Sequence, residues 1–325
     1  LVIGGTGLLG RHTIDELLHH KDYKVVSLAL PGVGSVPEGV EAIWGDLNKM
    51  SDEELLDLFR GKYAVFFAIG ADERTVPPAP AAKFFYEANV LPTQRVARLA
   101  REAGVKKFIL YGSYTADIAE KHPELGFREH NAYPRTRLLQ EEVAIMEGGD
   151  EMDVMTLRLP YIFGLVEGQL PLWKRVIEQA LGQENPVVLP GSTSSVTARQ
   201  VGQAAVGAME HGEHGAKYPI NAYNLTYKEL TRLACEAIGK NPDQVITLDL
   251  ATVLPGYEQL QAQTDAAGLE HGVHLPDIAR LQAEDMVTDP EETAVLEISD
   301  DDVVAAIREA FKVCVEAAAS TEPSN

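Results

Sequence analysis

The sequence has little cysteine and a shortage of basic residues. Its two cysteines, Cys235 and Cys314, form no metal-binding or Cys-x-x-Cys spacing, so we expect core thiols of a protein in a reducing compartment. There are 28 Lys and Arg against 49 Asp and Glu, a net charge of −21. Because binding a phosphate backbone or an anionic membrane requires a basic face, we expect no nucleic-acid partner and no membrane partner.

Long apolar runs and internal repeats are also missing. No run approaches the roughly 20 residues that span a membrane, and no signal-peptide pattern is seen. We therefore expect a cytoplasmic protein. The 325 residues, 45% of them hydrophobic, suffice for one large α/β domain with a smaller attachment.

The opening stretch, LVIGGTGLLG, predicts a strand, a tight turn and the start of a helix. Unpaired N–H groups in the first turn of such a helix attract a phosphate. Gly4, Gly7 and Gly10 would let the backbone approach a pyrophosphate and the helix approach the strand. A glycine-rich turn alone also fits an ordinary tight turn, but the strand and helix alternation that follows favours dinucleotide binding.

The rest of the first half continues this alternation. Strands are predicted at residues 24–30, 40–44, 63–68 and 107–111, and helices from Ser51, at 84–103 and at 138–146. The pattern predicts an α/β fold with a doubly wound parallel (Rossmann) sheet.

The residues at the expected ribose site do not distinguish NAD from NADP. An acidic residue about 20 positions after the glycines would bind the adenosine ribose of NAD, but Leu30, Pro31 and Gly32 stand there. No Lys or Arg stands there for the 2′-phosphate of NADP. Arg11 is the nearest cation, and its position equally fits a solvated helix residue.

Tyr133 and Arg137 form a candidate acid/base unit. Pro134 suits the first turn of a helix, which places both side chains on one side of that helix. A nearby cation favours phenolate, and Ser113 at a strand end could hydrogen-bond the same substrate oxygen. The structural alternatives are an interface aromatic for Tyr133, a surface pair of Arg137 with Glu141, and a turn residue for Ser113.

These motifs, in this order, resemble the extended short-chain dehydrogenase/reductase superfamily, in its NAD-dependent epimerase/dehydratase branch. GGTGLLG resembles the family's GxxGxxG turn, Gly45-Asp46-Leu47 its adenine-contacting Asp-Leu pair, and Asn89-Val90-Leu91-Pro92-Thr93 its Asn-Val-x-Gly-Thr helix. Ser113 and Tyr133 stand at its catalytic positions. The segments at 157–164 and 224–230 resemble its strand beside the nicotinamide and its passage into the substrate-side domain.

The resemblance implies hydride transfer between NAD or NADP and a carbinol or carbonyl carbon of a small-molecule substrate. Nucleotide-sugar epimerisation or dehydration is the family's commonest chemistry, carbonyl reduction the next, and a homodimer is a further expectation. Catalysis would fall to Ser113, Tyr133 and Arg137. The implied cofactor contacts are Gly4, Thr6, Gly7, Leu8, Leu9, Gly10, Asp46, Leu47, Ala68, Ile69, Gly70, Asn89, Tyr111, Tyr133, Arg137, Pro160, Tyr161 and Ile162.

Two departures from the family pattern matter for function. The family's Tyr-x-x-x-Lys is Tyr133-x-x-x-Arg137 here, and arginine keeps the charge but cannot give up a proton, so a proton relay through it is not expected. This leaves an alternative, a non-catalytic NAD(P)-binding sensor or regulatory protein. Arg199, where the family has a valine-aspartate stretch, would either bind an anionic substrate group or begin a surface helix.

The expected domains are discontinuous. Residues 1–164 and 196–222 are assigned to the NAD(P)-binding Rossmann domain, and residues 165–195 and 223–325 to a smaller substrate-side α/β cap. Trp173 is expected to pack in the cap or to stack on a sugar. The loop 72–78 is either solvated or contacts substrate, and His271 and His274 lack a ligand pattern, so we expect no metal site.

Overall fold

The computed structural model describes residues 1–20 and 23–320, and its largest element is a parallel sheet. The strands are β1 (Val2–Ile3), β2 (Val26–Ala29), β3 (Glu41–Trp44), β4 (Ala64–Phe67), β5 (Lys107–Ser113), β6 (Asp153–Leu159) and β10 (Lys217–Pro219). They follow the order β10-β6-β5-β4-β1-β2-β3, and each neighbouring pair is parallel. The predicted doubly wound α/β sheet is confirmed.

The order of the sheet reverses between β1 and β4. From β1 the chain builds β2 and β3 on one side and then β4, β5 and β6 on the other. The carboxyl ends of strands beside such a reversal leave a crevice in which open α/β sheets bind their ligands. We therefore expect a ligand site at the carboxyl ends of β1, β4 and β5.

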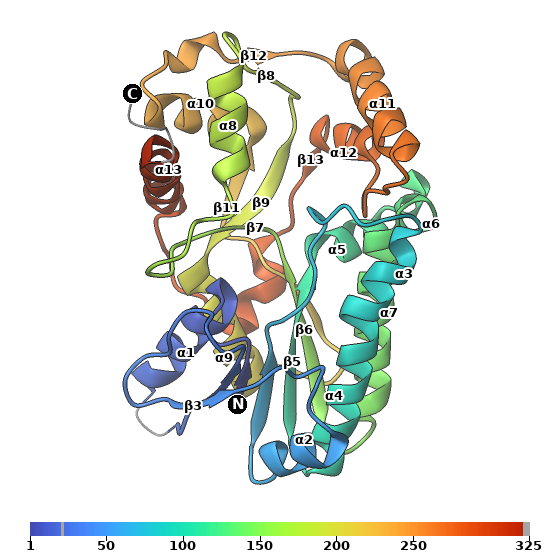
Figure 1. Cartoon of the computed structure of the whole chain (residues 1–325), viewed down its shortest axis with the longest axis vertical. Helices are drawn as coiled ribbons and strands as arrows, with labels where there is room; N and C mark the ends of the chain where they lie inside the picture. The colour runs from blue at the N-terminus through green and yellow to red at the C-terminus, as the bar shows by residue number, and fades with distance from the viewer. Residues whose placement is uncertain (21–22, 321–325) are drawn as a thin grey trace.

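Helices cover both faces of this sheet (Figure 1). One face carries α1 (Leu8–His19) and α9 (Ala198–His211), where Ile14 and Leu17 pack with Val201. The other face carries α2 (Asp52–Phe59), α4 (Leu91–Glu102) and α7 (Ala132–Gly148). The predicted helix start at Ser51 is confirmed, because Ser51 and Glu54 form a reciprocal capping box at α2.

The helix predicted at residues 84–103 is present, but it begins earlier and changes its winding. It starts as α3 (Ala81–Phe85), continues through a π-helical turn, η1 (Tyr86–Val90), and becomes α4. Leu91 N–H donates to the Tyr86 carbonyl, and Pro92, which has no N–H, follows. Short elements α5 (Tyr114–Lys121), η2 (Pro123–Leu125) and α6 (Phe127–His130) lead into α7.

A second layer of structure lies beyond the carboxyl ends of the strands, in the upper half of Figure 1. Its mixed sheet has the order β11-β9-β13, with β7 paired to β9, and a small β8-β12 pair lies apart. The expected boundary at residue 196 falls within β9. The elements of this layer are β7 (Tyr161–Phe163), α8 (Lys174–Gly182), β8 (Val187–Val188), β9 (Ser192–Thr197), β11 (Tyr223–Thr226), α10 (Tyr227–Ala237), η3 (Pro242–Gln244), β12 (Ile246–Thr247), α11 (Leu250–Ala266), α12 (Leu275–Gln282), β13 (Asp285–Met286) and α13 (Val303–Ser320). Between β13 and α13, η4 (Pro290–Leu296) returns to pack on α9 and β10 of the main sheet.

Helices α8, α10 and α13 share their own apolar core, in which Ile177, Leu233 and Phe311 are buried. The two cysteines lie in this core as free, buried thiols, as expected. Over residues 1–20 and 23–320, no helix combines the length and the apolar character needed to cross a membrane.

Candidate active site

The glycine-rich turn allows α1 to pack closely against the turn that follows the central strand β1. Gly4 has φ +88°, and a Cβ there would lie 2.6 Å from the Ala68 carbonyl oxygen. A Cβ on Gly10 would lie 2.2 Å from the Gly4 carbonyl oxygen. Each position therefore requires glycine, the first for its backbone conformation and both for space.

The first turn of α1 presents backbone N–H groups to a cavity. Gly7 is the N-cap residue, and no side chain in the described part of the chain caps this helix. Leu8 and Leu9 line the cavity. Uncapped N–H groups at the positive end of a helix dipole suit a diphosphate, so the turn fits the pyrophosphate of a dinucleotide.

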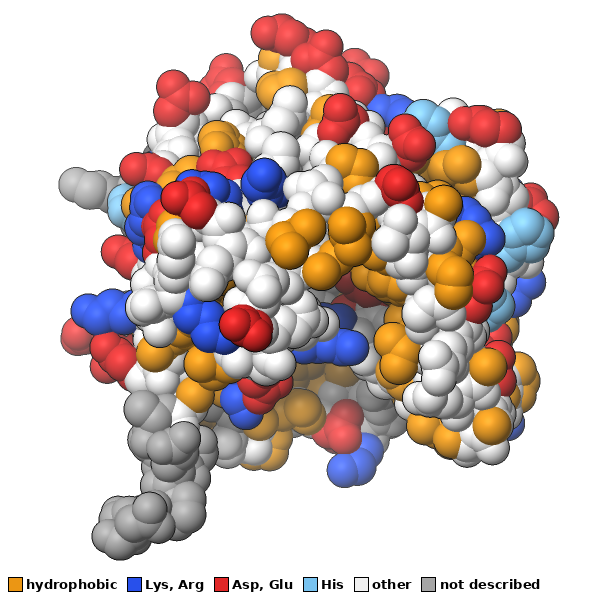
Figure 2. Space-filling model, turned by 90° about the horizontal axis from the view of Figure 1, so that it is seen from above, with side chains coloured by type: hydrophobic (Ala, Val, Ile, Leu, Met, Phe, Trp, Pro, Cys, Tyr) orange, Lys and Arg blue, Asp and Glu red, His pale blue; other side chains and the backbone are white. Residues whose placement is uncertain are grey.

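The cavity itself has a volume of about 820 Å³ and lies between the sheet and the second layer. Its floor consists of strand ends and the residues that follow them, at 68–74 after β4, 111–113 in β5 and 159–162 after β6. Its walls come from α8, α10, α11 and α12. Seen from above, apolar side chains gather around a hollow in the surface (Figure 2).

Tyr133 lies at the start of α7 and faces this cavity while 3% exposed. Burial raises the pKa of Tyr133 to about 12, although the Arg137 charge and hydrogen bonding to Ser113 lower it. Glu73 and Asp72 act in the opposite direction and raise it. Tyr133 is therefore a protonated phenol with both a cation and a hydroxyl group close by.

The segment before α12 fixes the position of Tyr133. Tyr133 N–H donates to the Gly272 carbonyl at 2.8 Å, and the ring packs edge-on against Phe85 at 5.1 Å between centroids. Asn131, the N-cap residue of α7, accepts a hydrogen bond from His274 N–H at 2.8 Å. Gly272 and His274, which no sequence motif singled out as contacts of this helix, thus hold its start in place.

Arg137 follows one turn later and is also buried, at 6% exposed. Its Nη2 donates to the carbonyl oxygen of Tyr111 in β5, and its Cζ lies 5.5 Å from the centroid of the Tyr133 ring. Its Nε has no hydrogen-bond partner among the described residues. The predicted alternative of a surface pair with Glu141 is not found, because Glu141 instead binds Arg158. A buried, unpaired donor at the cavity floor fits a polar ligand group, such as a ribose hydroxyl.

Ser113 ends β5 and caps the next helix. Its Oγ accepts from Thr115 N–H at 3.2 Å and lies 2.9 Å from the Thr115 hydroxyl. Ser113 lines the cavity next to Tyr133, so the strand end and the helix start bring the two predicted catalytic hydroxyls together.

The loop after β4 brings charge to the same place. Asp72 and Arg74 bind each other, with Arg74 Nε 3.0 Å from Asp72 Oδ1. Glu73, between them, lines the cavity, and its pKa is raised by burial and by Asp72. Of the two expectations for this loop, contact with the cavity is what the geometry favours.

The predicted cofactor residues fall into two groups. Those that line the cavity are Leu8, Leu9, Ala68, Ile69, Gly70, Tyr111, Tyr133, Arg137, Pro160, Tyr161 and Ile162. The others are not part of its lining: Gly4, Thr6, Gly7, Gly10, Asp46, Leu47 and Asn89.

Several residues of this second group have defined partners. The Asn89 side chain binds both backbone groups of Ala71, at 2.8 and 3.0 Å, and so holds the loop after β4. Asp46 pairs with Lys49 at 3.1 Å, and Leu47 is buried in the core. The Thr6 carbonyl accepts a hydrogen bond from Gln169 at 2.7 Å.

The structure also shows the surroundings of Arg199 and Trp173, for which the sequence left two alternatives each. Arg199 pairs with Asp301 on the surface at 2.9 Å, which agrees with a surface helix start. Trp173 lines the cavity, stacks on Phe163 at 4.3 Å and donates to the Ile162 carbonyl, so it packs within the cap. Among the residues that the structure describes, no cluster of three or more His, Cys, Asp or Glu could hold a metal ion.

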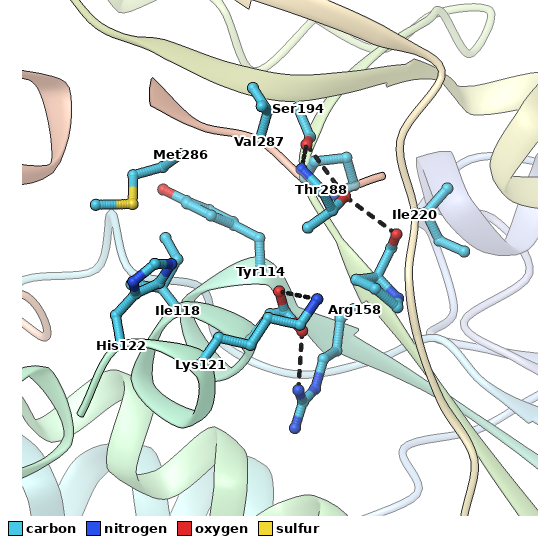
Figure 3. A pocket seen from close by; sticks show the side chains of 13 residues that line it. Tyr114, Ile118, Lys121, His122, Arg158, Ser194, Ile220, Met286, Val287 and Thr288 are labelled. Carbon is cyan, nitrogen blue, oxygen red and sulfur yellow. Dashed lines mark hydrogen bonds and ion pairs between the residues drawn. The ribbon is translucent and has the colours of Figure 1, made fainter. Parts of the chain in front are cut away.

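A smaller cavity of about 40 Å³ lies behind Tyr114 (Figure 3). Polar groups of Lys121, Arg158, Ser194 and Thr288 line it. Tyr114 borders both cavities, and its pKa is raised by burial, so it is a neutral wall between them. Tyr114 is not among the residues predicted from the motifs, although its position directly after Ser113 at a strand end was a usable signal.

The fold and the site together define a Rossmann-type protein whose glycine-rich turn and cavity suit a dinucleotide. The model of the NAD dependent epimerase/dehydratase family matches residues 1–225, and the chain belongs to this family. NAD is the cofactor on which the family depends. The glycine turn, the uncapped start of α1 and the unpaired Arg137 Nε fit such a molecule.

Curated relatives are similar to part of this chain. Sterol-4-alpha-carboxylate 3-dehydrogenase, decarboxylating, of Homo sapiens is 30% identical over 179 residues, which cover 52% of this chain and 46% of the relative. The Mus musculus protein is 29% identical over 178 residues, with 52% and 47% covered. The chain thus spans about half the length of the curated relatives it matches.

Solved structures are similar over nearly the whole chain. The crystal structure of gox2253 has a TM-score of 0.75 at 19% identity and covers 97% of both chains. DesIV, a dTDP-glucose 4,6-dehydratase from Streptomyces venezuelae with NAD and TYD bound, has a TM-score of 0.68 at 16% identity, with 99% of this chain and 98% of that chain covered. At such identities the likeness concerns the fold.

Proposed function

We propose that this chain is an NAD-dependent dehydrogenase or reductase that acts at a carbinol or carbonyl carbon of a small molecule. The observation that carries this proposal is the placement of the Tyr133 phenol beside Ser113 and Arg137 at the floor of the cavity. NAD, when bound, supplies the hydride chemistry. The chain's own residues bind the substrate oxygen and move its proton.

Each of the three side chains has a separate task in this proposal. The Tyr133 hydroxyl exchanges a proton with the substrate oxygen, and Ser113 hydrogen-bonds that oxygen. Arg137 stabilises the phenolate form of Tyr133 by its charge, and its free Nε is available to a ribose hydroxyl. Because arginine does not release a proton, the proton leaves Tyr133 by another route.

The relatives give two substrate classes for this site. One is the sterol carboxylate in the name of the curated dehydrogenases, and the other is the nucleotide sugar of solved structures such as MoeE5 with UDP-glucose and NAD. Both classes present a carbinol to a hydride acceptor. The proposal therefore concerns the reaction at the carbinol carbon, which is the same for a substrate of either class.

The substitution Tyr133→Phe tests the proposal. We expect NAD binding measured by calorimetry to be retained and kcat to fall by about 10²-fold to 10⁴-fold, the usual contribution of a general acid/base. Unchanged turnover would contradict the role of Tyr133. NAD binding with no turnover of any alcohol or carbonyl compound by the unaltered chain would instead favour a dinucleotide sensor.

A further inference from the structure

The cap side of the cavity is lined mainly by apolar side chains. Helix α8 contributes Val176 and Ala180, α11 contributes Leu260, and α12 contributes Ile278 and Leu281. The segment 187–189 adds two valines and a leucine. These side chains come from four separate stretches of the chain and converge on one space, so a ligand here contacts mainly hydrocarbon, with the polar side chains of Gln179, Gln183 and Gln282 among it.

The aromatic residues of the wall are uncharged. Burial raises the pKa of Tyr161 to about 12 and that of Tyr227 well above its usual value. The Tyr161 ring lies edge-on to Tyr227 at 6.3 Å and tilted to Trp173 at 5.1 Å. This part of the wall is therefore aromatic and neutral at physiological pH.

Few side chains of the lining are charged. At the floor, Asp72 and Arg74 neutralise each other, Arg137 is turned toward Tyr111, and burial raises the pKa of Glu73. On the cap side, Arg175 lies at the start of α8, and burial lowers the pKa of His271. A diphosphate carries two negative charges that need several cationic or N–H partners, and the cap side offers mainly hydrocarbon instead.

We propose that the substrate is an alcohol or ketone with an uncharged, apolar body, which the cap wall covers while the reacting carbon lies beside Tyr133 and Ser113. This inference rests on the function proposed above and names its substrate class. The oxygen of the substrate is then its main polar group inside the cavity, and the two hydroxyls bind it. The apolar body contributes affinity in proportion to the area that it removes from water.

A homologous series of ketones measures this contribution. Butan-2-one, hexan-2-one, octan-2-one and decan-2-one are titrated by calorimetry into the protein with oxidised NAD present, a pairing that cannot transfer a hydride. We expect affinity to rise about threefold to fourfold per methylene group, so that decan-2-one, with six more methylene groups, binds about 700-fold to 4,000-fold more tightly than butan-2-one. UDP-glucose, titrated in the same way, is expected to bind more weakly than decan-2-one.

A pair of matched variants tests whether decan-2-one binds at the apolar cap wall. Leu260 in the cavity lining and Leu181 outside it are both helical leucines, 51% and 50% exposed. Leu260→Asp is expected to weaken decan-2-one binding about tenfold or more, because a carboxylate enters the apolar wall. Leu181→Asp is expected to leave it unchanged. Since both side chains are half exposed, both variants are expected to fold, which circular dichroism confirms.

The outcomes separate this inference from the proposed function. A flat series, or tight UDP-glucose binding with weak ketone binding, overturns the apolar substrate class, and so does equal binding by the two leucine variants. If the ketone series shows the expected slope but decan-2-ol is not oxidised with NAD, the apolar cavity stands and the proposed hydride transfer fails. If decan-2-ol is oxidised in preference to butan-2-ol, both stand.

Discussion

Arg137 lies one turn after Tyr133 on α7, with its Cζ 5.5 Å from the centre of the tyrosine ring and its Nη2 bound to the Tyr111 carbonyl. The guanidinium is thus anchored to the sheet and faces the phenol. Its charge lowers the pKa of Tyr133, against the larger effect of burial that raises it to about 12. The arginine can therefore take over the electrostatic part of the role that lysine has in the family.

The substitution Arg137→Met removes this charge while keeping an apolar stem. We expect the pKa of Tyr133 to rise further and the oxidation rate at fixed pH to fall about tenfold or more, since a pKa one unit higher gives a tenfold smaller phenolate fraction. The measurement is the pH dependence of kcat, whose rising limb should move to higher pH. Arg137→Lys is the control and should keep the rising limb near its original position, so equal shifts in both variants would contradict the electrostatic role.

Glu73 is expected to oppose Arg137. Its charge raises the pKa of Tyr133, so Glu73→Gln should lower that pKa and move the rising limb of kcat to lower pH. We expect an increase in the oxidation rate of less than about tenfold at a fixed pH below the limb. No movement of the limb would show that Glu73 is screened from Tyr133.

The same carboxyl group gives a pH dependence of stability. Burial and Asp72 raise the pKa of Glu73 above its ordinary value of 4.5, so between 4.5 and the raised pKa the folded chain binds more protons than the unfolded chain. The contribution of Glu73 is therefore favourable below this window and is lost as the pH rises through it. Glu73→Gln should raise the melting temperature near neutral pH and have little effect below pH 4.5.

Two helical glycines should respond to alanine in opposite ways. A Cβ at Gly10 would lie 2.2 Å from a backbone oxygen, so we expect Gly10→Ala to cost about 1–3 kcal/mol of unfolding free energy and to weaken NAD binding. Gly256 in α11 is exposed, and apart from its own turn of helix no atom of the described residues lies within 4 Å of the place that a Cβ would take, so Gly256→Ala should add about 0.5–1 kcal/mol. Urea unfolding of the two variants checks this, and equal effects would contradict the role of close packing at Gly10.

The elements that the sequence predicted correctly are those with a local cause. The glycine turn, the capped start at Ser51 and the apolar strands each follow from neighbouring residues, and the structure has all of them. The approach of Ser113 to Tyr133 was also predictable from the family pattern. In these cases, local conformational preference and a known motif spacing are sufficient to predict the structure.

Long-range contacts account for what the sequence did not predict. The clamp on Tyr133 by Gly272, and that on Asn131 by His274, join segments more than 130 positions apart. Asn89 lies in a π-helical turn, which helical periodicity does not reveal, and its side chain binds Ala71 in the loop after β4. The apolar cap wall arises only when four distant stretches converge.

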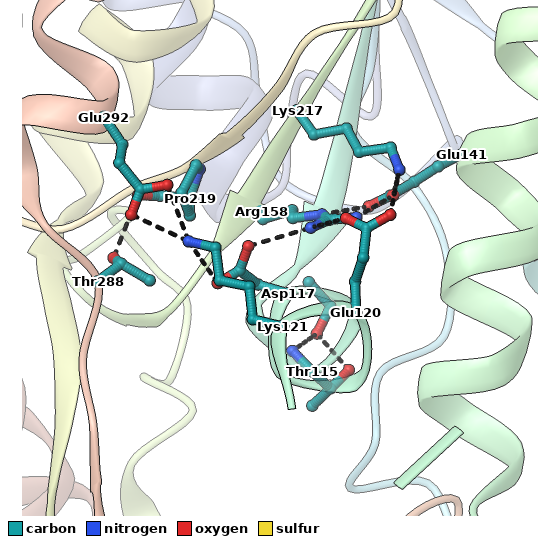
Figure 4. A network of polar contacts seen from close by, with 11 residues as sticks. Thr115, Asp117, Glu120, Lys121, Glu141, Arg158, Lys217, Pro219, Thr288 and Glu292 are labelled. Atoms are coloured by element: carbon teal, nitrogen blue, oxygen red, sulfur yellow. Dashed lines mark hydrogen bonds and ion pairs between the residues drawn. The ribbon is translucent and has the colours of Figure 1, made fainter. Parts of the chain in front are cut away.

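Arg158 on β6 lies at the centre of a buried charge network beneath the site (Figure 4). Its guanidinium binds Glu141 at 2.8 and 3.1 Å and Asp117 at 3.0 Å, and the partially exposed Glu120 at 2.7 Å. Arg158 is 2% exposed and Glu141 1%. Burial raises the pKa of Glu141, and the hydrogen bond and charge of Arg158 lower it by a smaller amount. The network joins β6 to α5, which Ser113 caps, and to α7, which carries Tyr133 at its start.

Removing Arg158 should therefore destabilise the fold strongly. We expect Arg158→Met to cost about 3–5 kcal/mol of unfolding free energy at neutral pH, because Glu141 and Asp117 are left buried with much of their charge uncompensated. The cost should be smaller in mildly acidic solution, where Glu141 with its raised pKa can take up a proton. The double variant Arg158→Met with Glu141→Leu should recover part of the loss, since it also removes the unpaired carboxylate. Urea unfolding of the single and double variants at both pH values measures these differences, and a pH-independent cost with no recovery would mean that lost packing, not an unpaired buried charge, destabilises the variant.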